Sequence, residues 1–273
     1  MTDSPPSTGW GGKRRSMKPL VFYDIPGDVE GTAWSPNTWR IRYTLNYKQL
    51  PYTTTWVEYP SIASTCQSLG VPPTSAWPSG APMYTLPALH DPSTATSLSG
   101  SLAIALYLDR EYPDTPHVIP DGTAALHAAF DAAFTDAVSP HMQMLVMSVM
   151  VRERRLHEES MAYYRKAREW QWGGSMDEWA PPGTDARRAH WRGLQEAFGT
   201  VKTWLDPIGG DGRRFVTGDR PAFADFVVAG RLMWMKKILG QNSDEWKAVE
   251  AWHHGRWARL LGDMERYARV VDS

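Results

Sequence analysis

Ser35 is the residue whose type and position could best support chemistry. It stands directly before Pro36, after an apolar run at residues 20–23 and a turn that contains glycine and proline. Serine is a preferred helix N-cap and proline suits the first helical position, so we expect a helix to begin here. A strand, a turn and a helix start in this order direct backbone N–H groups towards an anion. Local chemistry alone nevertheless favours a plain capping role for Ser35.

The other chemically capable residues lack the neighbours that a reactive or metal site needs. Cys66 has no basic residue beside it that would lower the pKa of its thiol, so we interpret it as a bystander. His253 and His254 are adjacent and therefore face different ways on a helix, without metal-ligand spacing. The glycine-rich stretch 209–214 follows no strand, which indicates a turn and not a nucleotide loop. We therefore expect no metal site.

Composition narrows the class of protein further. The chain has 273 residues and a formal net charge of −1, which argues against nucleic acid as a partner because nucleic acid needs a basic face. No window approaches eighteen consecutive apolar residues, so we expect no membrane span. A single cysteine excludes an internal disulfide framework and fits a reducing cytoplasm. The 14 tryptophans and 11 tyrosines are sufficient for a core and for a pocket that binds flat or apolar ligands.

The elements around Ser35 predict a β-α-β unit. The apolar run 20–23 reads as a strand, residues 36–47 as a helix, and the β-branched and aromatic segment 52–58 as a second, parallel strand. After a proline-rich stretch at 71–82 that we expect to be irregular come two short strands, at 84–91 and 94–98. Pro87 interrupts the first of these, so that segment must form an edge, a bulge or a cis turn.

The second half of the chain predicts only helices. A helix over 100–112 ends at a proline-rich linker, residues 113–122, which is the best domain boundary. Apolar residues then recur with helical spacing. The predicted helices cover residues 123–134, 142–172, 185–205, 223–239 and 242–261. We therefore expect a flexible tail at 1–18, a small α/β domain at 19–112 and an all-α domain at 123–273.

Several segments resemble the glutathione transferases. The segment S-P-N-T-W-R-I-R from residue 35 resembles the active-site helix start of serine-type tau and zeta transferases, and T-L-P-A-L from residue 85 resembles the cis-proline segment of thioredoxin-like domains. The segment G-D-R-P-A-F-A-D-F from residue 218 resembles the start of the buried helix of the second domain. Residues 56–63 and 72–92 are similar to the fungal-specific class A transferases, serine-type relatives of the bacterial lignin β-etherases.

The resemblance implies a thioredoxin-like glutathione-binding domain, an all-helical substrate domain and glutathione as co-substrate. It implies that the Ser35 hydroxyl donates to the glutathione sulfur and favours the reactive thiolate, with Asn37 assisting. Leu86 would pair with the cysteinyl backbone of glutathione like an added strand, positioned by Pro87. Ser101 would hold the γ-glutamyl carboxylate at a helix N-terminus.

Gly100 departs from the family pattern. Most transferases carry Glu, Gln or Asp directly before the serine at position 101, where it accepts from the γ-glutamyl ammonium group, and glycine offers no acceptor. Losing a charge-assisted hydrogen bond costs about 1.5–3 kcal/mol, or about ten- to a hundredfold in affinity. We therefore expect weakened glutathione binding. Ala222, where a Ser or Thr cap is usual, is a milder departure that costs on the order of 1 kcal/mol.

The resemblance implies a cytoplasmic, homodimeric glutathione transferase. It would conjugate or exchange glutathione on small aromatic or apolar electrophiles, including by ether cleavage. Two alternatives remain open at this stage. One is a non-catalytic carrier for phenolic or apolar molecules, and the other is a lyase or cyclase that uses the same fold without glutathione. Gly100 favours the alternatives, whereas Ser35 with the Thr-Leu-Pro segment favours the transferase.

Overall fold

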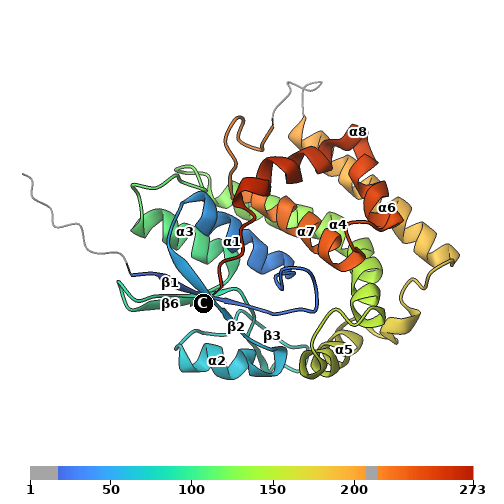
Figure 1. Cartoon of the computed structure of the whole chain (residues 1–273), viewed down its shortest axis with the longest axis horizontal. Helices are drawn as coiled ribbons and strands as arrows, with labels where there is room; N and C mark the ends of the chain where they lie inside the picture. The colour runs from blue at the N-terminus through green and yellow to red at the C-terminus, as the bar shows by residue number, and fades with distance from the viewer. Residues whose placement is uncertain (1–17, 207–213, 273) are drawn as a thin grey trace, which may run out of the picture.

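The computed structural model describes residues 18–206 and 214–272. Figure 1 shows a small sheet with its helices beside a larger group of helices. This arrangement confirms the predicted fold, a thioredoxin-like N-terminal domain followed by an all-helical C-terminal domain. The predicted tail at 1–18 lies outside the described residues except for residue 18. The predicted turn at 209–214 lies outside them except for residue 214.

A four-stranded mixed sheet forms the centre of the N-terminal domain. In spatial order its strands are β2 (Tyr52–Trp56), β1 (Leu20–Asp24), β5 (Ala88–Asp91) and β6 (Thr96–Ser99). Strand β1 runs parallel to β2, as the predicted β-α-β unit requires, and antiparallel to β5. Because β5 begins directly after Pro87, the proline lies outside the ladder, to which it could not donate.

Helix α1 is buried on almost every side. The N-terminal helices are α1 (Pro36–Tyr47), α2 (Ile62–Ser68) and α3 (Ser101–Glu111). Helix α1 packs against α3 and against α7 (Phe223–Leu239) of the second domain. Its Arg42 pairs at 2.7 Å with Asp24 at the end of β1, and both side chains are fully buried. The two buried charges compensate each other, so the pair fixes α1 against the sheet.

The proline-rich stretch expected to be irregular contains a small hairpin. Strands β3 (Ser75–Ala76) and β4 (Pro82–Met83) pair antiparallel. The turn between them is closed by a hydrogen bond from Trp77 N to Ala81 O at 2.8 Å, and Gly80 adopts a φ of +82°. Glycine accommodates this left-handed conformation without steric cost. The prediction missed the hairpin because each strand has only two residues and so shows no periodicity.

The helices of the second domain confirm the all-α prediction but not all of its boundaries. They are α4 (Ala124–Arg152), α5 (Glu158–Trp172), α6 (Asp185–Leu205), α7 (Phe223–Leu239) and α8 (Asp244–Met264). The predicted break before residue 142 is wrong, because α4 continues through Pro140. The predicted helix 142–172 is instead interrupted after Arg152, where Arg154 has a φ of +51°. Packing of α4 against α6 and α7 outweighs the cost of the internal proline.

The last predicted helix is also bent. Helix α8 is kinked at residues 252–255, where His253 and His254 both have left-handed backbone conformations. His253 is half-buried and its Nδ1 atom accepts from Trp257 Nε1 at 2.8 Å, whereas His254 is exposed. The sequence prediction of a continuous helix was therefore wrong at this point, since periodicity does not report such a local kink.

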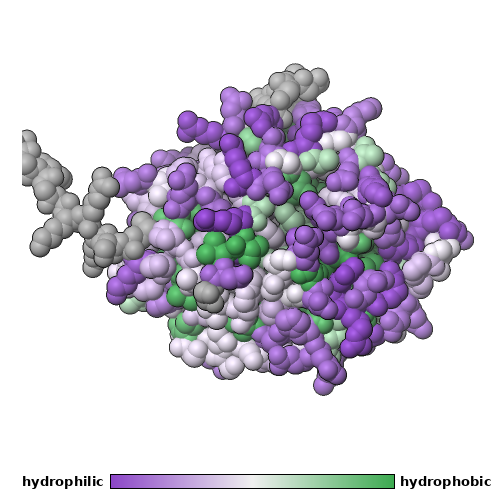
Figure 2. Space-filling view, viewed as in Figure 1, coloured by the Kyte–Doolittle hydropathy of each residue, from purple (hydrophilic) through white to green (hydrophobic). Residues whose placement is uncertain are grey.

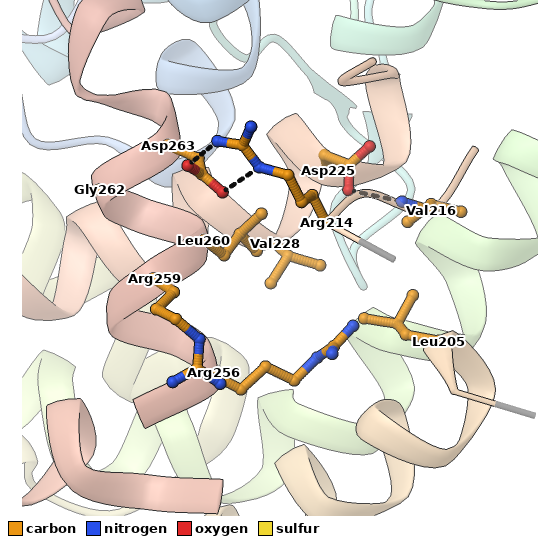
Figure 3. A pocket seen from close by; sticks show the side chains of 10 residues that line it. All are labelled: Leu205, Arg214, Val216, Asp225, Val228, Arg256, Arg259, Leu260, Gly262 and Asp263. Atoms are coloured by element: carbon orange, nitrogen blue, oxygen red, sulfur yellow. Dashed lines mark hydrogen bonds and ion pairs between the residues drawn. The ribbon is translucent and has the colours of Figure 1, made fainter. Parts of the chain in front are cut away.

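The start of α7 is held by a buried carboxylate. Asp225 accepts from the backbone N–H group of Val216 at 2.9 Å (Figure 3). It also accepts from the backbone N–H group of Ala222 at 2.9 Å. Burial raises the pKa of Asp225 to about 7. Ala222 itself supplies no side-chain cap, as predicted, and Asp225 satisfies the N–H group of that residue instead. Beside Asp225 lies a cavity of about 550 Å³ that is bordered by the two described ends of the chain around residues 207–213.

Two sets of polar contacts join the domains. Lys48, directly after α1, pairs at 2.7 Å with Asp109 of α3. Asp109 also accepts from the backbone N–H groups of Val118 and Ile119 in the linker. The C-terminal residues return to the sheet side of the molecule (Figure 1). There Thr54 of β2 donates to Val271 O at 2.5 Å. The linker and the chain end therefore both fix the second domain against the first.

The described residues contain neither a membrane-spanning helix nor a cluster of metal-binding side chains. No helix within 18–206 or 214–272 is long and apolar enough to cross a membrane. The same ranges contain no group of three or more His, Cys, Asp and Glu side chains that could hold a metal ion. On the face drawn in Figure 2, hydrophilic residues cover most of the surface and hydrophobic residues appear in smaller patches between them.

Candidate functional site

Ser35 occupies the N-cap position of α1 without acting as a side-chain cap. Its carbonyl oxygen accepts from Trp39 N and from Thr38 Oγ1, each at 3.0 Å, which begins the helix. Its hydroxyl makes no capping hydrogen bond. The plain capping role expected from local chemistry is therefore not adopted. The residue is only 4% exposed and lines the two cavities described next.

Two cavities meet at Ser35 and Asn37. Their volumes are about 150 and 180 Å³, and both are lined by Ser35, Asn37, Tyr59, Tyr164 and Arg168. The first, which we call the inner cavity, continues along residues 82–86 of the N-terminal domain. The second, which we call the rear cavity, continues along α4 and α7. The structure therefore brings the two predicted catalytic residues together on one wall.

Leu86 also lines the inner cavity. The Leu86–Pro87 peptide bond is cis, as the resemblance implied. Within the described part of the chain, Leu86 makes neither a backbone–backbone hydrogen bond nor one to a side chain. Pro87 does not line either cavity, but its carbonyl oxygen accepts from Gly100 N at 3.2 Å, which places the segment beside the start of α3.

Ser101 is the first residue of α3 and lies outside both cavities. Its Oγ atom accepts from Arg40 Nη1 at 3.3 Å, and the same Arg40 atom donates to Asp131 Oδ2 at 2.7 Å. Gly100 precedes it with a φ of +89°, and a Cβ atom built there would meet no other atom within 4 Å. The position of Gly100 is thus open in space but restricted in backbone conformation.

Sequence reasoning missed the charges around Ser101. Arg40 is 5% exposed, and burial lowers its pKa while Asp131 opposes that change. The positive charge of Arg40 also affects Arg231 of α7. Burial, together with repulsion by Arg40, lowers the pKa of Arg231 to about 9. Arg40 and Asp131 are 91 residues apart, and no local pattern in the sequence indicates that they meet.

Sequence reasoning also missed the wall that the second domain provides. Tyr59 and Tyr164 have ring centroids 5.4 Å apart across the domain boundary, and burial raises the pKa of both hydroxyls, which are therefore protonated donors. Tyr59 is held in place because its backbone N–H donates to Ser160 Oγ at 2.8 Å. Ser160 in turn donates to Glu58. The only sequence signal was the segment from residue 56, which was used for the family resemblance and not for the site.

An open aromatic groove adjoins the inner cavity. We call it the outer groove; its volume is about 420 Å³, and its walls include Trp77 of the hairpin segment and Trp170 of α5. The centroids of these two indole rings are 5.6 Å apart. The outer groove and the inner cavity share Trp77, Tyr163 and Ala167, so they are continuous. Flat, apolar molecules fit walls of this chemistry.

Cys66 lies apart from this site, whereas one methionine of α4 borders it. Cys66 is buried in α2, and burial raises the pKa of its thiol, which fits the predicted bystander. Within α4, Met142 and Met150 are fully buried in the core, while Met147 lines the rear cavity.

Comparison with known families agrees with this geometry. Residues 34–111 match the N-terminal domain of glutathione S-transferases, and residues 125–267 match the C-terminal domain. A curated relative from Aspergillus flavus, the glutathione S-transferase-like protein ustS, is 31% identical over 271 residues, which cover 92% of this chain and 95% of the relative.

Solved fungal structures show the same fold over almost the whole chain. A glutathione S-transferase of Ceriporiopsis subvermispora, crystallised in complex with glutathione, is 44% identical with a TM-score of 0.89, over 94% of this chain and 100% of that one. Glutathione transferase GSTFuA3 from Phanerochaete chrysosporium is 36% identical with a TM-score of 0.87 over the same shares. The resemblance to the glutathione transferases is thereby confirmed.

Proposed function

The chain belongs to the glutathione S-transferase family, and from this premise we propose that it is a glutathione transferase of the fungal class A type. Its co-substrate is glutathione, and its acceptors are small aromatic or apolar electrophiles, including aryl ethers that it cleaves. The observation that carries the proposal is Ser35: its hydroxyl is not used as a helix cap and borders a cavity between the domains.

In this proposal Ser35 activates the sulfur of glutathione. A thiol with a pKa near 8.5 is mostly protonated at neutral pH, and only the thiolate attacks. A hydroxyl that donates to the sulfur at the start of α1 favours the anion by hydrogen bonding and through the helix dipole. Asn37, which lines the same cavities, assists. No carboxylate lines either cavity within the described residues, so nothing there repels the developing anion.

Glutathione would extend from Ser35 towards the start of α3. The backbone groups of Leu86 make no hydrogen bond within the described chain and would pair with the cysteinyl residue. Pro87 positions this segment, and Ser101 holds the γ-glutamyl carboxylate at the N-terminus of α3. Because Gly100 offers no acceptor to the γ-glutamyl ammonium group, we propose that glutathione binds more weakly than in relatives that carry an acid or amide there.

The test is glutathione conjugation to a generic electrophile such as 1-chloro-2,4-dinitrobenzene. The Ser35→Ala variant should lose most of the activity, and the pKa of the bound glutathione thiol should rise. The ultraviolet absorbance of the thiolate, measured across pH, gives this pKa. Ser64→Ala is a matched control, since this exposed serine on α2 bonds only to the backbone of its own turn. Full activity and an unchanged thiol pKa in Ser35→Ala would contradict the proposal.

The outer groove supports a second candidate, a carrier of phenolic or apolar molecules without transferase activity. Trp170 lines this groove and is 52% exposed. Such a large exposed aromatic surface is typical of a site that binds an apolar ligand. Quenching of tryptophan fluorescence by phenolic ligands, together with no glutathione conjugation of any acceptor, would favour the carrier. Turnover of a phenolic acceptor in the absence of glutathione would instead favour a lyase or cyclase.

We also propose a homodimer in the cytoplasm. Leu106 of α3 and Leu126 of α4 are 39% and 68% exposed, and a partner subunit would remove this apolar surface from water. Light scattering of the purified chain gives its mass, and Leu126→Lys should shift a dimer towards the monomer. Cys66 is a free thiol, which fits a reducing compartment, and fractionation of cells that express the chain tests the location.

A further inference from the structure

Arg168 of α5 lines both cavities at Ser35, and the mechanism described so far does not use it. In the described part of the chain it is the only charged residue on the wall of the inner cavity. Among the described residues that line the rear cavity, Arg231 is the only other charged one, and it is also a cation. The site between the domains is therefore electropositive on the side that the second domain provides.

The contacts of Arg168 hold the guanidinium without neutralising it. Its Nη1 atom donates to Gln171 Oε1 at 2.6 Å, and its guanidinium carbon lies 5.2 Å from the centroid of the Tyr164 ring. Its Nε atom is buried and has no partner among the described residues. No carboxylate of residues 18–206 or 214–272 forms an ion pair with Arg168. Burial opposes its charge, but interactions with Tyr164 and Tyr59 raise its pKa, so it remains a cation.

A partly buried cation without a carboxylate partner is costly, and such groups are concentrated at functional sites. The natural ligand of this arrangement is an anion that forms during the reaction. Two anions are available to a glutathione transferase: the thiolate, and an oxyanion that develops on the acceptor. The thiolate belongs on the side of Ser35 and Leu86, which the N-terminal domain provides.

The position of Arg168 favours the acceptor. Arg168 extends from α5, and two other residues of this helix, Tyr163 and Ala167, line both the inner cavity and the outer groove, so α5 borders the passage between them. An aromatic ring that lies against Trp77 or Trp170 in the outer groove would direct its reacting bond into the inner cavity. We propose that Arg168 is a catalytic residue that binds the oxygen on which negative charge develops, and that the acceptors are aryl ethers whose leaving group is a phenolate.

The chemistry balances with glutathione as the only other reactant. The thiol first loses its proton to solvent, and the thiolate attacks the carbon bonded to the ether oxygen. The new C–S bond forms as the C–O bond breaks, and the electron pair of that bond goes to the oxygen. Arg168 donates to this phenolate, which later takes a proton from solvent. The products are a thioether of glutathione and a phenol, and no oxidation occurs.

The first test needs no glutathione and therefore does not depend on turnover. The probe is 4-nitrophenol, whose colour reports its ionisation when it is bound to the protein. A cation nearby should lower the pKa of the bound phenol by about 1 to 3. The Arg168→Gln variant should abolish this change, while Arg168→Lys should retain part of it. Arg165→Gln is the matched control, because Arg165 lies one turn away on α5 and pairs with Asp177 outside the site.

The second test concerns the proposed acceptors and rests on the proposed function. A series of phenacyl aryl ethers with progressively poorer phenol leaving groups is assayed with glutathione. Arg168→Gln should reduce kcat/KM about a hundredfold for unsubstituted phenol and much less for 4-nitrophenol, because a poor leaving group needs more stabilisation. The dependence of log kcat/KM on the pKa of the phenol therefore becomes steeper. Arg165→Gln should leave it unchanged.

Distinct results would overturn the inference. In the titration, they are failure of 4-nitrophenol to bind to the wild-type chain, or a pKa of bound 4-nitrophenol that is unchanged in Arg168→Gln. In the kinetic series, the contrary result is an equal loss of activity in Arg168→Gln for every leaving group. A further contrary result is a raised thiol pKa of glutathione bound to Arg168→Gln. The last result would assign the charge to the sulfur. If instead the wild-type chain forms no thioether with any acceptor, the proposed function fails, and the 4-nitrophenol titration still decides whether Arg168 binds an oxyanion.

Discussion

Arg40 on α1 and Asp131 on α4 form an ion pair of 2.7 Å that links the two domains next to the start of α3. The same Arg40 nitrogen donates to Ser101, the residue proposed to hold one end of glutathione. The orientation of this serine therefore depends on a carboxylate of the other domain. This relationship connects the stability of the domain interface with the affinity for glutathione.

Replacing Asp131 tests that connection. In Asp131→Asn the buried Arg40 loses its counter-charge, so we expect the free energy of unfolding to fall by about 2 kcal/mol. Glutathione affinity should fall as well, because Arg40 would compete for the Ser101 hydroxyl. Urea denaturation and calorimetry measure the two effects. Asp136→Asn, an exposed acid on the same helix, should change neither. A stable variant with normal glutathione affinity would show that the pair is dispensable.

Gly100 offers a gain-of-function test. In Gly100→Gln we expect glutathione affinity to rise about tenfold, since the new amide accepts from the γ-glutamyl ammonium group and has open space around it. The stability should fall by about 1–2 kcal/mol because position 100 has a φ of +89°. Gly122→Gln is the control: this glycine is also left-handed and open, so it should show the stability loss alone.

If calorimetry finds no gain in affinity for Gly100→Gln, another group already satisfies the ammonium. The proposal of weakened binding would then be wrong. The stability measurement keeps this result interpretable, since an unfolded variant would be recognised by the absence of a cooperative transition.

The pKa of Asp225 predicts a pH-dependent contribution to stability. Burial raises this pKa from 3.8 to about 7, so the folded protein binds a proton that the unfolded chain has lost between these two values. The stability due to Asp225 is therefore greatest below pH 3.8, decreases as pH rises towards 7, and is constant above that. The difference in unfolding free energy between wild type and Asp225→Asn, measured by urea denaturation across this range, should follow that curve.

Asp219→Asn provides the control for this titration, because Asp219 is an exposed acid close in the sequence to Asp225. The difference between wild type and Asp219→Asn should not vary over the same pH range. A difference between wild type and Asp225→Asn that increases with pH would mean that hydrogen bonds from Val216 and Ala222 outweigh burial at this carboxylate.

Ser160 should control the wall formed by Tyr59. Ser160→Ala removes the acceptor of the Tyr59 N–H group and the donor to Glu58, so we expect a loss of about 1–2 kcal/mol in unfolding free energy. KM for aromatic acceptors should rise, because Tyr59 loses its anchor on α5. The measurements are urea denaturation and steady-state kinetics. Ser64→Ala on α2 should be neutral in both, and an unchanged KM in Ser160→Ala would separate this anchor from acceptor binding.

The amino-acid sequence by itself determined the local elements and the fold class. A β-α-β unit was predicted from the apolar run before the Ser35-Pro36 helix start and from the strand after that helix. The proline-rich linker predicted that this unit is joined to a helical domain, and the structure confirms both elements. These features depend on backbone preferences and periodicity over a few residues, which are legible in sequence. The break predicted before residue 142 shows the limit of such patterns, because packing around α4 overrides the effect of Pro140.

Only the tertiary structure decided how the side chains of the site meet. The sequence could not show that Ser35 leaves its hydroxyl unused as a cap, that Arg40 reaches Asp131, or that Arg168 shares a cavity with Ser35. The physical reason is that such contacts join residues about a hundred positions apart. Their geometry follows from the packing of the two domains, in which α1 lies against α7, and not from the preferences of neighbouring residues.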